Sequence, residues 1–269
     1  MKLAFSTLGC PGWSWNEIFA TAKDLGLDGI EVRGVGKEMY APKAKPFLPE
    51  NINTTIEKSK NGNIEICMLT SGATLGIGNG EEAMSEAKEY VDLAAKLGVK
   101  YIRVMIANHP EPMEGENLKQ GKLLYQQLCE YAATKNVSPL IETNGELANS
   151  EVIREFMSGI SAENAGVLWD IHHPYRFFEE TPAETYENIG RWVRYIHLKD
   201  SIGDANDVQY RMMGYGNVPV LDTLKILNDN GYNGYVTLEW VKRWNPDLQE
   251  PGIVFSHFVN YMRCLFNQL

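Results

Sequence analysis

Short apolar or β-branched segments alternate along the whole chain with longer segments that have the periodicity of an α-helix. Eight of the short segments are typical of strands: Leu3–Thr7, Gly29–Arg33, Ile64–Thr70, Tyr101–Ile106, Pro139–Thr143, Gly166–Asp170, Arg194–Leu198 and Tyr235–Trp240. The helical segments between them include Ser14–Leu25, Glu81–Leu97, Asn117–Thr134, Val220–Asn230 and Pro246–Phe266. Because strands that alternate with helices are joined by crossovers, the pattern predicts a parallel sheet.

Glycines mark the ends of three helical segments. Gly26, Gly98 and Gly231 each follow a helical run and precede a strand, where a left-handed C-cap favours glycine. An open doubly wound sheet usually carries a glycine-rich nucleotide motif after its first strand, but Gly9–Gly12 fits no such motif. The eight units average about 34 residues, and 269 residues is close to the ~250 of a typical barrel. We therefore predict an α/β fold, a single (β/α)8 TIM barrel that spans residues 1–269 as one domain.

The charge balance limits the class of partner. The chain has 25 Lys and Arg against 35 Asp and Glu, a net charge of −10 with neutral histidines. Nucleic acid binding depends on basic side chains that replace counterions, so this balance argues against a nucleic acid partner. We expect a small-molecule ligand instead, and the sequence leaves a homo-oligomer open.

Cysteine usage and hydropathy indicate the compartment. Four cysteines lie far apart without a CxxC pair, and we expect them to be buried thiols of a reducing compartment: Cys10, Cys67, Cys129 and Cys264. The first residues lack the apolar core of about 7–15 residues that a signal peptide needs. No apolar run of ~18 residues could span a bilayer. We therefore expect a cytoplasmic protein without a membrane segment.

Four side chains that can bind a metal stand at or near the ends of four consecutive predicted strands: Glu142, Asp170, His197 and Glu239. Alternate residues of a strand share a face, so each of the four would point into the barrel. An unpaired carboxylate there is costly, and three carboxylates that converge with one imidazole therefore need a cation. This donor set suits one divalent ion, Mn²⁺ or Mg²⁺ ahead of Co²⁺, Zn²⁺ or Fe²⁺.

Other residues are candidates for contact with a substrate. Trp13 follows the first strand and could stack on a sugar ring, although tryptophan also packs between helices and barrel. Lys199 shares the inward face of its strand, where it could hold a substrate oxygen or neutralise the carboxylates, and His109 lies on a loop over the same end. We interpret Glu31 and Arg33, on the second strand, as a structural ion pair.

Five motifs give the chain a resemblance to a known family. They are Ile141-Glu142-Thr143-Asn144-Gly145, Trp169-Asp170-Ile171-His172-His173, Ile196-His197-Leu198-Lys199-Asp200, Gly214-Tyr215-Gly216 and Leu238-Glu239-Trp240. Across essentially its whole length the sequence resembles the xylose isomerase-like barrel superfamily. Within it, the resemblance is to the sugar isomerases and epimerases grouped with tagatose-3-epimerase and the inositol-catabolism enzymes.

The resemblance implies roles for individual residues. The Glu, Asp, His and Glu that bind one divalent metal in this family correspond to Glu142, Asp170, His197 and Glu239. The family's substrate-binding histidine corresponds to His173, and its substrate-binding arginine corresponds loosely to Arg211. Asn144 departs from the family, because many members have histidine there. We assign the neighbouring His172 to a solvent-facing loop.

Together these residues imply a metal-dependent sugar isomerase or epimerase that acts on a ketose, aldose or polyol ketone. The cation would stabilise an enediolate, with Glu142 and Glu239 as general base and general acid. The same metal and base would serve a dehydratase or lyase on a keto-sugar or keto-inositol. Only Gly214-Tyr215-Gly216 resembles a phosphate cradle, which favours an unphosphorylated substrate.

Three further functions fit less well. A DNA repair enzyme like endonuclease IV needs more His and Asp ligands than a chain with five histidines offers. A two-metal hydride shift, as in xylose isomerase itself, would need acidic ligands around Asp200, Asp204 and Asp207, whose spacing does not match that second site. A sugar-binding barrel without activity is disfavoured because all four metal ligands are present.

Overall fold

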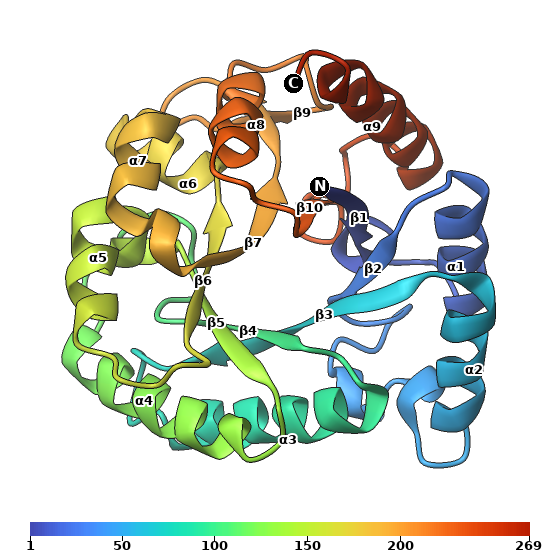
Figure 1. Ribbon diagram of the computed structural model, residues 1–269, viewed down its shortest axis with the longest axis horizontal. Coiled ribbons are helices and arrows are strands. Elements are labelled where there is room, and N and C mark those ends of the chain that lie inside the picture. The colour runs from blue at the N-terminus through green and yellow to red at the C-terminus, as the bar shows by residue number, and fades with distance from the viewer.

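The computed structural model describes residues 1–269 and contains a closed barrel of eight parallel strands. These strands are β1 (Lys2–Ser6), β2 (Gly29–Val32), β3 (Glu65–Thr74), β4 (Tyr101–Met105), β5 (Ser138–Glu142), β6 (Gly166–Asp170), β7 (Val193–Leu198) and β10 (Tyr235–Leu238). They follow one another around the barrel in the order β1-β10-β7-β6-β5-β4-β3-β2. Figure 1 shows the strands at the centre and the helices in a ring outside them. The structure thus confirms the predicted (β/α)8 TIM barrel.

The helices that cover the barrel are α1 (Trp15–Asp24), α2 (Ile52–Gly62), α3 (Glu81–Leu97), α4 (Leu118–Ala133), α5 (Ser150–Ser158), α6 (His172–Phe178), α7 (Pro182–Ile189), α8 (Val220–Asp229) and α9 (Pro251–Phe266). Short 3₁₀ helices cover Thr7–Gly9, Ala41–Lys43, Lys45–Phe47, Gly145–Ala148 and Gly190–Trp192. Helix α9 begins at Pro251 rather than Pro246, because proline suits the first turn of a helix. Helix α2 buries only Thr55, so it has no apolar stripe that a sequence pattern could reveal.

Local interactions define the ends of individual helices. Helix α1 starts with a capping box, in which Ser14 and Glu17 satisfy each other's backbone N–H groups. Helix α3 ends at Gly98, which has a φ of +72° and donates its N–H to the carbonyl of Ala94. Glycine adopts this left-handed conformation without a steric penalty from a Cβ atom. The helix therefore ends where the sequence predicts it.

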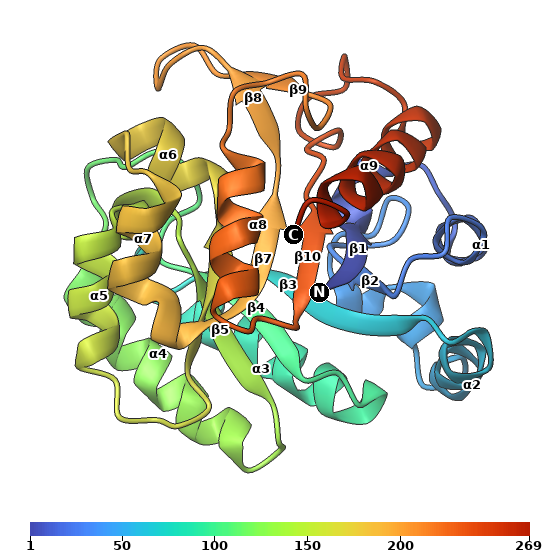
Figure 2. The ribbon, with the colours of Figure 1, turned by 45° about the horizontal axis from the view of Figure 1, so that its top comes forward.

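The segment after β7 contains an antiparallel hairpin. Strand β8 (Asp200–Ile202) pairs with β9 (Gln209–Arg211), and Figure 2 shows the hairpin standing above the barrel. The carboxylate of Asp200 accepts N–H groups of Gly214 and Gly216, and a Cβ on Gly216 would lie 2.0 Å from Asp200 Oδ1. The Gly214-Tyr215-Gly216 motif therefore folds around a carboxylate, which occupies the N–H groups that a phosphate would need.

Apolar packing lies in two layers around the strands. A cluster of 59 buried residues fills the space between barrel and helices. A smaller cluster lies inside the barrel and includes Met68, Leu140, Leu168 and Tyr195. These residues alternate along β3, β5, β6 and β7 with residues that face the helices. This layer fills the barrel interior below the carboxyl ends of the strands, where polar side chains lie instead.

Two findings concern the compartment and the membrane. Three of the four cysteines are buried as expected, whereas Cys264 is exposed near the end of α9, where the helix turns its outer face to solvent. None of the helices combines the length and the apolar character needed to cross a membrane.

Candidate metal centre

The structure brings Glu142, Asp170, His197 and Glu239 together at the carboxyl ends of neighbouring strands. One potential ligand atom from each lies within 4.8 Å of the corresponding atoms of the others. The Nδ1 atom of His197 lies 3.6 Å from Glu142 Oε1, 3.9 Å from Asp170 Oδ2 and 3.5 Å from Glu239 Oε1. All four residues are buried, and Asp170 and His197 have no exposed surface. The sequence-predicted set therefore forms one compact cluster.

The strand register explains this convergence. Asp170 on β6 lies directly beside His197 on β7, and His197 lies beside Thr237 on β10. Between β6 and β7 the register shifts after Val167, so that the last residue of β6, Asp170, aligns with the last but one of β7, His197. Glu142 is the last residue of β5, and Glu239 follows the last residue of β10. Four adjacent strands thus each present one donor at the same end of the barrel.

Unpartnered polar atoms inside the cluster fit a bound cation. Asp170 Oδ2 and His197 Nδ1 are buried and have no hydrogen-bond partner. The ammonium of Lys199 lies 2.7 Å from Asp170 Oδ2, but it is not aligned for a hydrogen bond. Buried polar atoms are normally satisfied, so two orphans that face each other indicate a ligand between them. The donor set of three carboxylates and one imidazole suits a divalent ion.

Fixed cations hold the two glutamates in their charged forms. Burial by itself would raise the pKa of Glu142, but the guanidinium of Arg103 and the ring of His197 outweigh it and hold this pKa well below its usual range. Burial also opposes ionisation of Glu239, yet Lys199 and His197 lower its pKa to about 2. Both carboxylates are therefore ionised at neutral pH and available to accept a proton.

Neighbouring carboxylates raise the pKa of the histidine in the cluster. Burial alone would lower the pKa of His197, but the carboxylates of Glu31 and Glu239 outweigh it and raise this pKa well above its usual range. In the metal-free protein the ring is therefore an imidazolium, and a metal at Nδ1 would replace one of its protons.

A cavity of about 590 Å³ opens beside the cluster. Four of the residues predicted from the sequence line it: Glu142, His173, Lys199 and Glu239. His109 lines it as well, from the loop after β4. The buried residues Asp170 and His197 lie behind this lining, which places them within the cluster and away from the space where a substrate would bind.

His173 and Lys199 form one hydrogen-bonded unit in the cavity wall. His173 Nδ1 lies 2.7 Å from the carbonyl oxygen of Thr143, which can only accept, so Nδ1 carries the proton. His173 Nε2 then accepts from Lys199 Nζ at 3.1 Å. The same ammonium donates to Glu239 Oε2. Lys199 therefore links the histidine to the glutamate across the wall of the cavity.

Two predicted substrate contacts lie elsewhere. The guanidinium of Arg211, on β9, donates to the carbonyl of Tyr210 and to the side chain of Gln209. Trp13 packs edge-on against the ring of Phe255 in the outer core. Neither Arg211 nor Trp13 lines the cavity.

Two expectations about neighbouring residues are wrong. Glu31 makes no ion pair with Arg33 and instead contacts His197 across the barrel. Arg33 lines the cavity at the end of β2, with no hydrogen bond to its guanidinium. His172 is fully buried rather than solvent-facing, because it belongs to helix α6 and its Nε2 bonds Ser201.

Sequence reasoning also missed Arg103, which lines the cavity and pairs with Glu142. Its signal was present in the alternation of β4, where Tyr101, Arg103 and Met105 share one face. An arginine on an inward-facing position needs a buried anion, and Glu142 on the next strand supplies it. Tyr210, on the short strand β9, and Trp244, in the segment after β10, line the same cavity.

The structure holds a second group of potential metal ligands beside the cluster. Asp170, His172 and His173 lie close enough to share an ion, but the ammonium of Lys199 already lies beside both Asp170 Oδ2 and His173 Nε2. In the loop after β7, Asp204 and Asp207 bond neighbouring backbone and side-chain groups, as Asp200 does.

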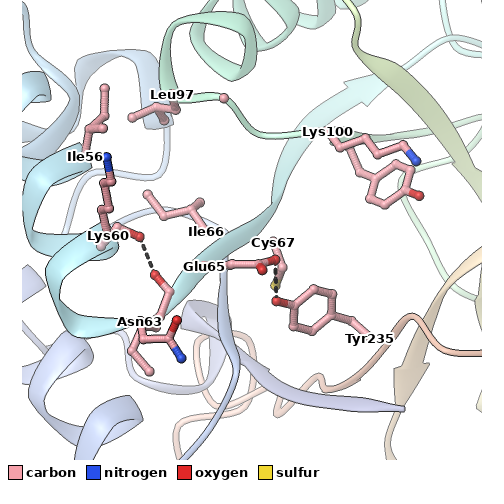
Figure 3. A pocket seen from close by; sticks show the side chains of 13 residues that line it. Ile56, Lys60, Asn63, Glu65, Ile66, Cys67, Leu97, Lys100 and Tyr235 are labelled. Atoms are coloured by element: carbon pink, nitrogen blue, oxygen red, sulfur yellow. Dashed lines mark hydrogen bonds between the residues drawn. The ribbon is translucent and has the colours of Figure 1, made fainter.

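A second hollow of about 440 Å³ lies at the opposite end of the barrel. Figure 3 shows it with Glu65 beside the hydroxyl of Tyr235, which donates to this carboxylate at 2.7 Å. Glu65 also accepts a hydrogen bond from Lys2, so its charge is already paired. Cys67 reaches the same hollow, but its thiol bonds Tyr195 inside the barrel. The carboxylate and histidine cluster therefore lies at the other end of the barrel, away from this hollow.

Comparison with known proteins agrees with this architecture. The family model described as "Xylose isomerase-like TIM barrel" matches residues 19–254. A curated relative, fructoselysine 3-epimerase of Shigella flexneri, is 25% identical, and the match covers 98% of this chain and 98% of the relative.

Two solved structures share the fold at low identity. The probable 3-DHS dehydratase AsbF of Bacillus anthracis is similar with a TM-score of 0.79 at 16% identity, over 98% of this chain and 99% of that one. The IOLI protein, with a bound zinc atom, also has a TM-score of 0.79 at 16% identity, over 97% and 96%. With its closed barrel, its buried carboxylate and histidine cluster and a family match over most of its length, the chain belongs to the xylose isomerase-like TIM barrel family.

Proposed function

We propose that this chain is a divalent-metal-dependent epimerase or isomerase of keto sugars that moves a proton through an enediolate. The observation that carries the proposal is the buried cluster of three carboxylates and one imidazole at the wall of a 590 Å³ cavity. The relative named fructoselysine 3-epimerase, which aligns over nearly the whole chain, supports the same class of reaction.

The residues that would hold the ion are Glu142, Asp170, His197 and Glu239. When bound, Mn²⁺ or Mg²⁺ would polarise the carbonyl of the substrate and so make the neighbouring C–H bond more acidic. The protein supplies the other elements of the reaction: two ionised carboxylates, fixed hydrogen-bond donors and a cavity of defined shape.

Glu142 and Glu239 are suited to the roles of general base and general acid. Each turns one oxygen, Oε1, towards His197 and the other, Oε2, towards a cation in the cavity wall. Glu142 Oε2 pairs with Arg103, and Glu239 Oε2 pairs with Lys199. Strands β6 and β7 separate the two glutamates in the barrel, so they approach the cavity from different sides. One can remove a proton from a carbon, and the other, once solvent has protonated it, can return that proton to the opposite face.

Polar groups around the cavity are placed to bind a polyhydroxylated substrate. The side-chain oxygen of Asn144 is buried at the cavity wall and has no hydrogen-bond partner, so it can accept from a sugar hydroxyl. Lys199 provides an N–H donor for developing negative charge, and His173, Arg33 and His109 lie at the same wall. The volume falls in the range of about 300–1,000 Å³ that holds drug-sized ligands, so a sugar with a substituent would fit.

Product analysis in deuterated water tests the proposal. The enzyme loaded with Mn²⁺ would be incubated with fructoselysine and with unsubstituted ketohexoses, and the products would be followed by NMR. Proton transfer through a glutamate predicts an epimer or isomer with deuterium at the reacting carbon. The matched control Glu239→Gln should release no labelled product.

Each other outcome of this experiment identifies a competing function. An unlabelled isomer would indicate a hydride shift. Loss of water from the substrate would indicate a dehydratase that uses the same base. Tight sugar binding without any turnover would indicate a binding barrel. Any of the three would contradict the proposed reaction.

A further inference from the structure

The imidazole of His197 lies between two groups of carboxylates. Its Nδ1 faces Glu142, Asp170 and Glu239 and has no hydrogen-bond partner. Its Nε2 lies 2.7 Å from Glu31 Oε2 on the other side of the ring. Both His197 and Glu31 have no exposed surface. One ring nitrogen is therefore bound within the protein, and the other is directed at the cluster.

The contact with Glu31 determines which nitrogen carries a proton. An ionised carboxylate can only accept a hydrogen bond, so Nε2 must donate and must keep its proton. Nδ1 is then the nitrogen left to bind a metal ion, which would replace any proton on it. Histidines that bind metals commonly donate their second N–H to a carboxylate in this way, which fixes the ring orientation and strengthens the ligand.

Glu31 reaches His197 from the opposite wall of the barrel. It lies on β2, whereas His197 lies on β7, and β1 and β10 separate these strands. The register between β2 and β3 shifts next to Glu31, because Ile30 pairs with Ile66 and Glu31 pairs with Met68. Irregularities of this kind redirect a side chain near active sites. The hydroxyl of Thr70 lies 3.4 Å from Glu31 Oε1 and supports the carboxylate weakly from β3.

The position of Glu31 excludes direct contact with a substrate. It does not line the cavity, and its contact with the cluster is the one to His197. We propose that Glu31 is a positioning residue that keeps a proton on His197 Nε2 and directs Nδ1 at the divalent ion. This inference rests on the metal site of the proposed function and extends it to a residue from the other half of the barrel.

Ring-nitrogen NMR of the full-length wild-type protein tests the proposal directly. Spectra of ¹⁵N-labelled histidine side chains would be recorded with and without Zn²⁺, a diamagnetic probe. The proposal predicts that His197 Nε2 carries a proton in both states and that the Nδ1 resonance shifts when Zn²⁺ binds. A zinc-loaded ring with its proton on Nδ1 would overturn it. This measurement needs no variant and therefore does not depend on how a substitution folds.

Zinc affinity of two variants provides the second test. Glu31→Gln removes the charge at nearly constant shape, and competition titration should show affinity for Zn²⁺ reduced by about 10–100-fold. The matched control Thr70→Val alters the same buried layer but leaves the carboxylate, and its affinity should stay within about twofold of wild type. The melting temperature of each metal-free variant reports stability separately.

The outcomes separate this inference from the proposed function. If the wild type binds no divalent ion, the metal site and the role of Glu31 both fail. If the wild type binds Zn²⁺ and folded Glu31→Gln binds it equally well, only the role of Glu31 fails. A variant that loses stability but keeps its affinity would show that Glu31 is a structural ion-pair partner.

Discussion

Glu142 and Glu239 face each other across the metal cluster, and each is paired with its own buried cation. Glu142 pairs with Arg103 and Glu239 with Lys199, while both direct a second oxygen towards His197 Nδ1. Two carboxylates this close would repel each other if they were unpaired. Their cations therefore allow both to be ionised at the same site, so either glutamate is able to take a proton from a substrate carbon.

Replacing either glutamate by glutamine should abolish most of the turnover. Glu142→Gln and Glu239→Gln each remove a proton-transfer group, for which a loss of about 10²–10⁴-fold in kcat is typical. The shape of the side chain is kept, so near-UV circular dichroism should be unchanged. The matched control Glu65→Gln, at the other end of the barrel, should keep its kcat. Equal losses in all three variants would contradict the assigned roles.

Removing Arg103 should destabilise the metal-free protein. Arg103→Met leaves the carboxylate of Glu142 buried without its partner, and breaking a buried ion pair in this way costs about 3–5 kcal/mol. Denaturant unfolding measures this change in the free energy of unfolding. Arg154→Met, which removes a surface arginine bonded to Asn188, should change it by less than about 0.5 kcal/mol. A similar cost in both variants would mean that Glu142 does not depend on Arg103.

The stability of the metal-free protein should fall on acidification. The pKa of Glu239 is about 2 in the folded protein against 4.5 as the reference value, because Lys199 and His197 outweigh the effect of burial. A lowered pKa contributes stability that is complete above about pH 4.5 and lost as the pH falls towards about 2. Urea unfolding across this range should show the decline, and Glu239→Gln should make it shallower. An unchanged slope in the variant would assign the decline to other carboxylates.

Metal removal should lower the melting temperature and metal addition should restore it. A ligand at 100 times its dissociation constant adds about 2.7 kcal/mol to the stability of the form that binds it. For a domain of this size that corresponds to roughly 5–10 °C, measurable by differential scanning calorimetry with EDTA and then with Mn²⁺. Asp170→Asn removes one oxygen donor and should abolish most of the shift. A full shift in that variant would place the ion elsewhere.

The alternation of strands and helices is a local property of the chain, and the sequence was sufficient to predict the barrel from it. Helix ends such as the one at Gly98 depend on the conformation of a single residue, so they too were predictable. The four cluster residues were predictable because each stands at the end of a strand, and parallel strands in a barrel end on the same side.

Contacts between distant parts of the chain were not predictable in the same way. Glu31 and Arg33 are two residues apart and were expected to pair, but in the barrel Glu31 contacts His197 and Arg33 lines the cavity. Trp13 follows the first strand in the sequence and Arg211 corresponds loosely to a family arginine, yet the outer core and the β8–β9 hairpin place them away from the cavity.

The sequence by itself determined the barrel and the donor atoms of the cluster, because hydrophobic period and strand ends are set by neighbouring residues. Only the tertiary structure decided which cation stands beside each carboxylate and which nitrogen of His197 faces the cluster. Those choices depend on closure of the barrel, which brings side chains from β2 and β4 against residues of β5, β7 and the end of β10.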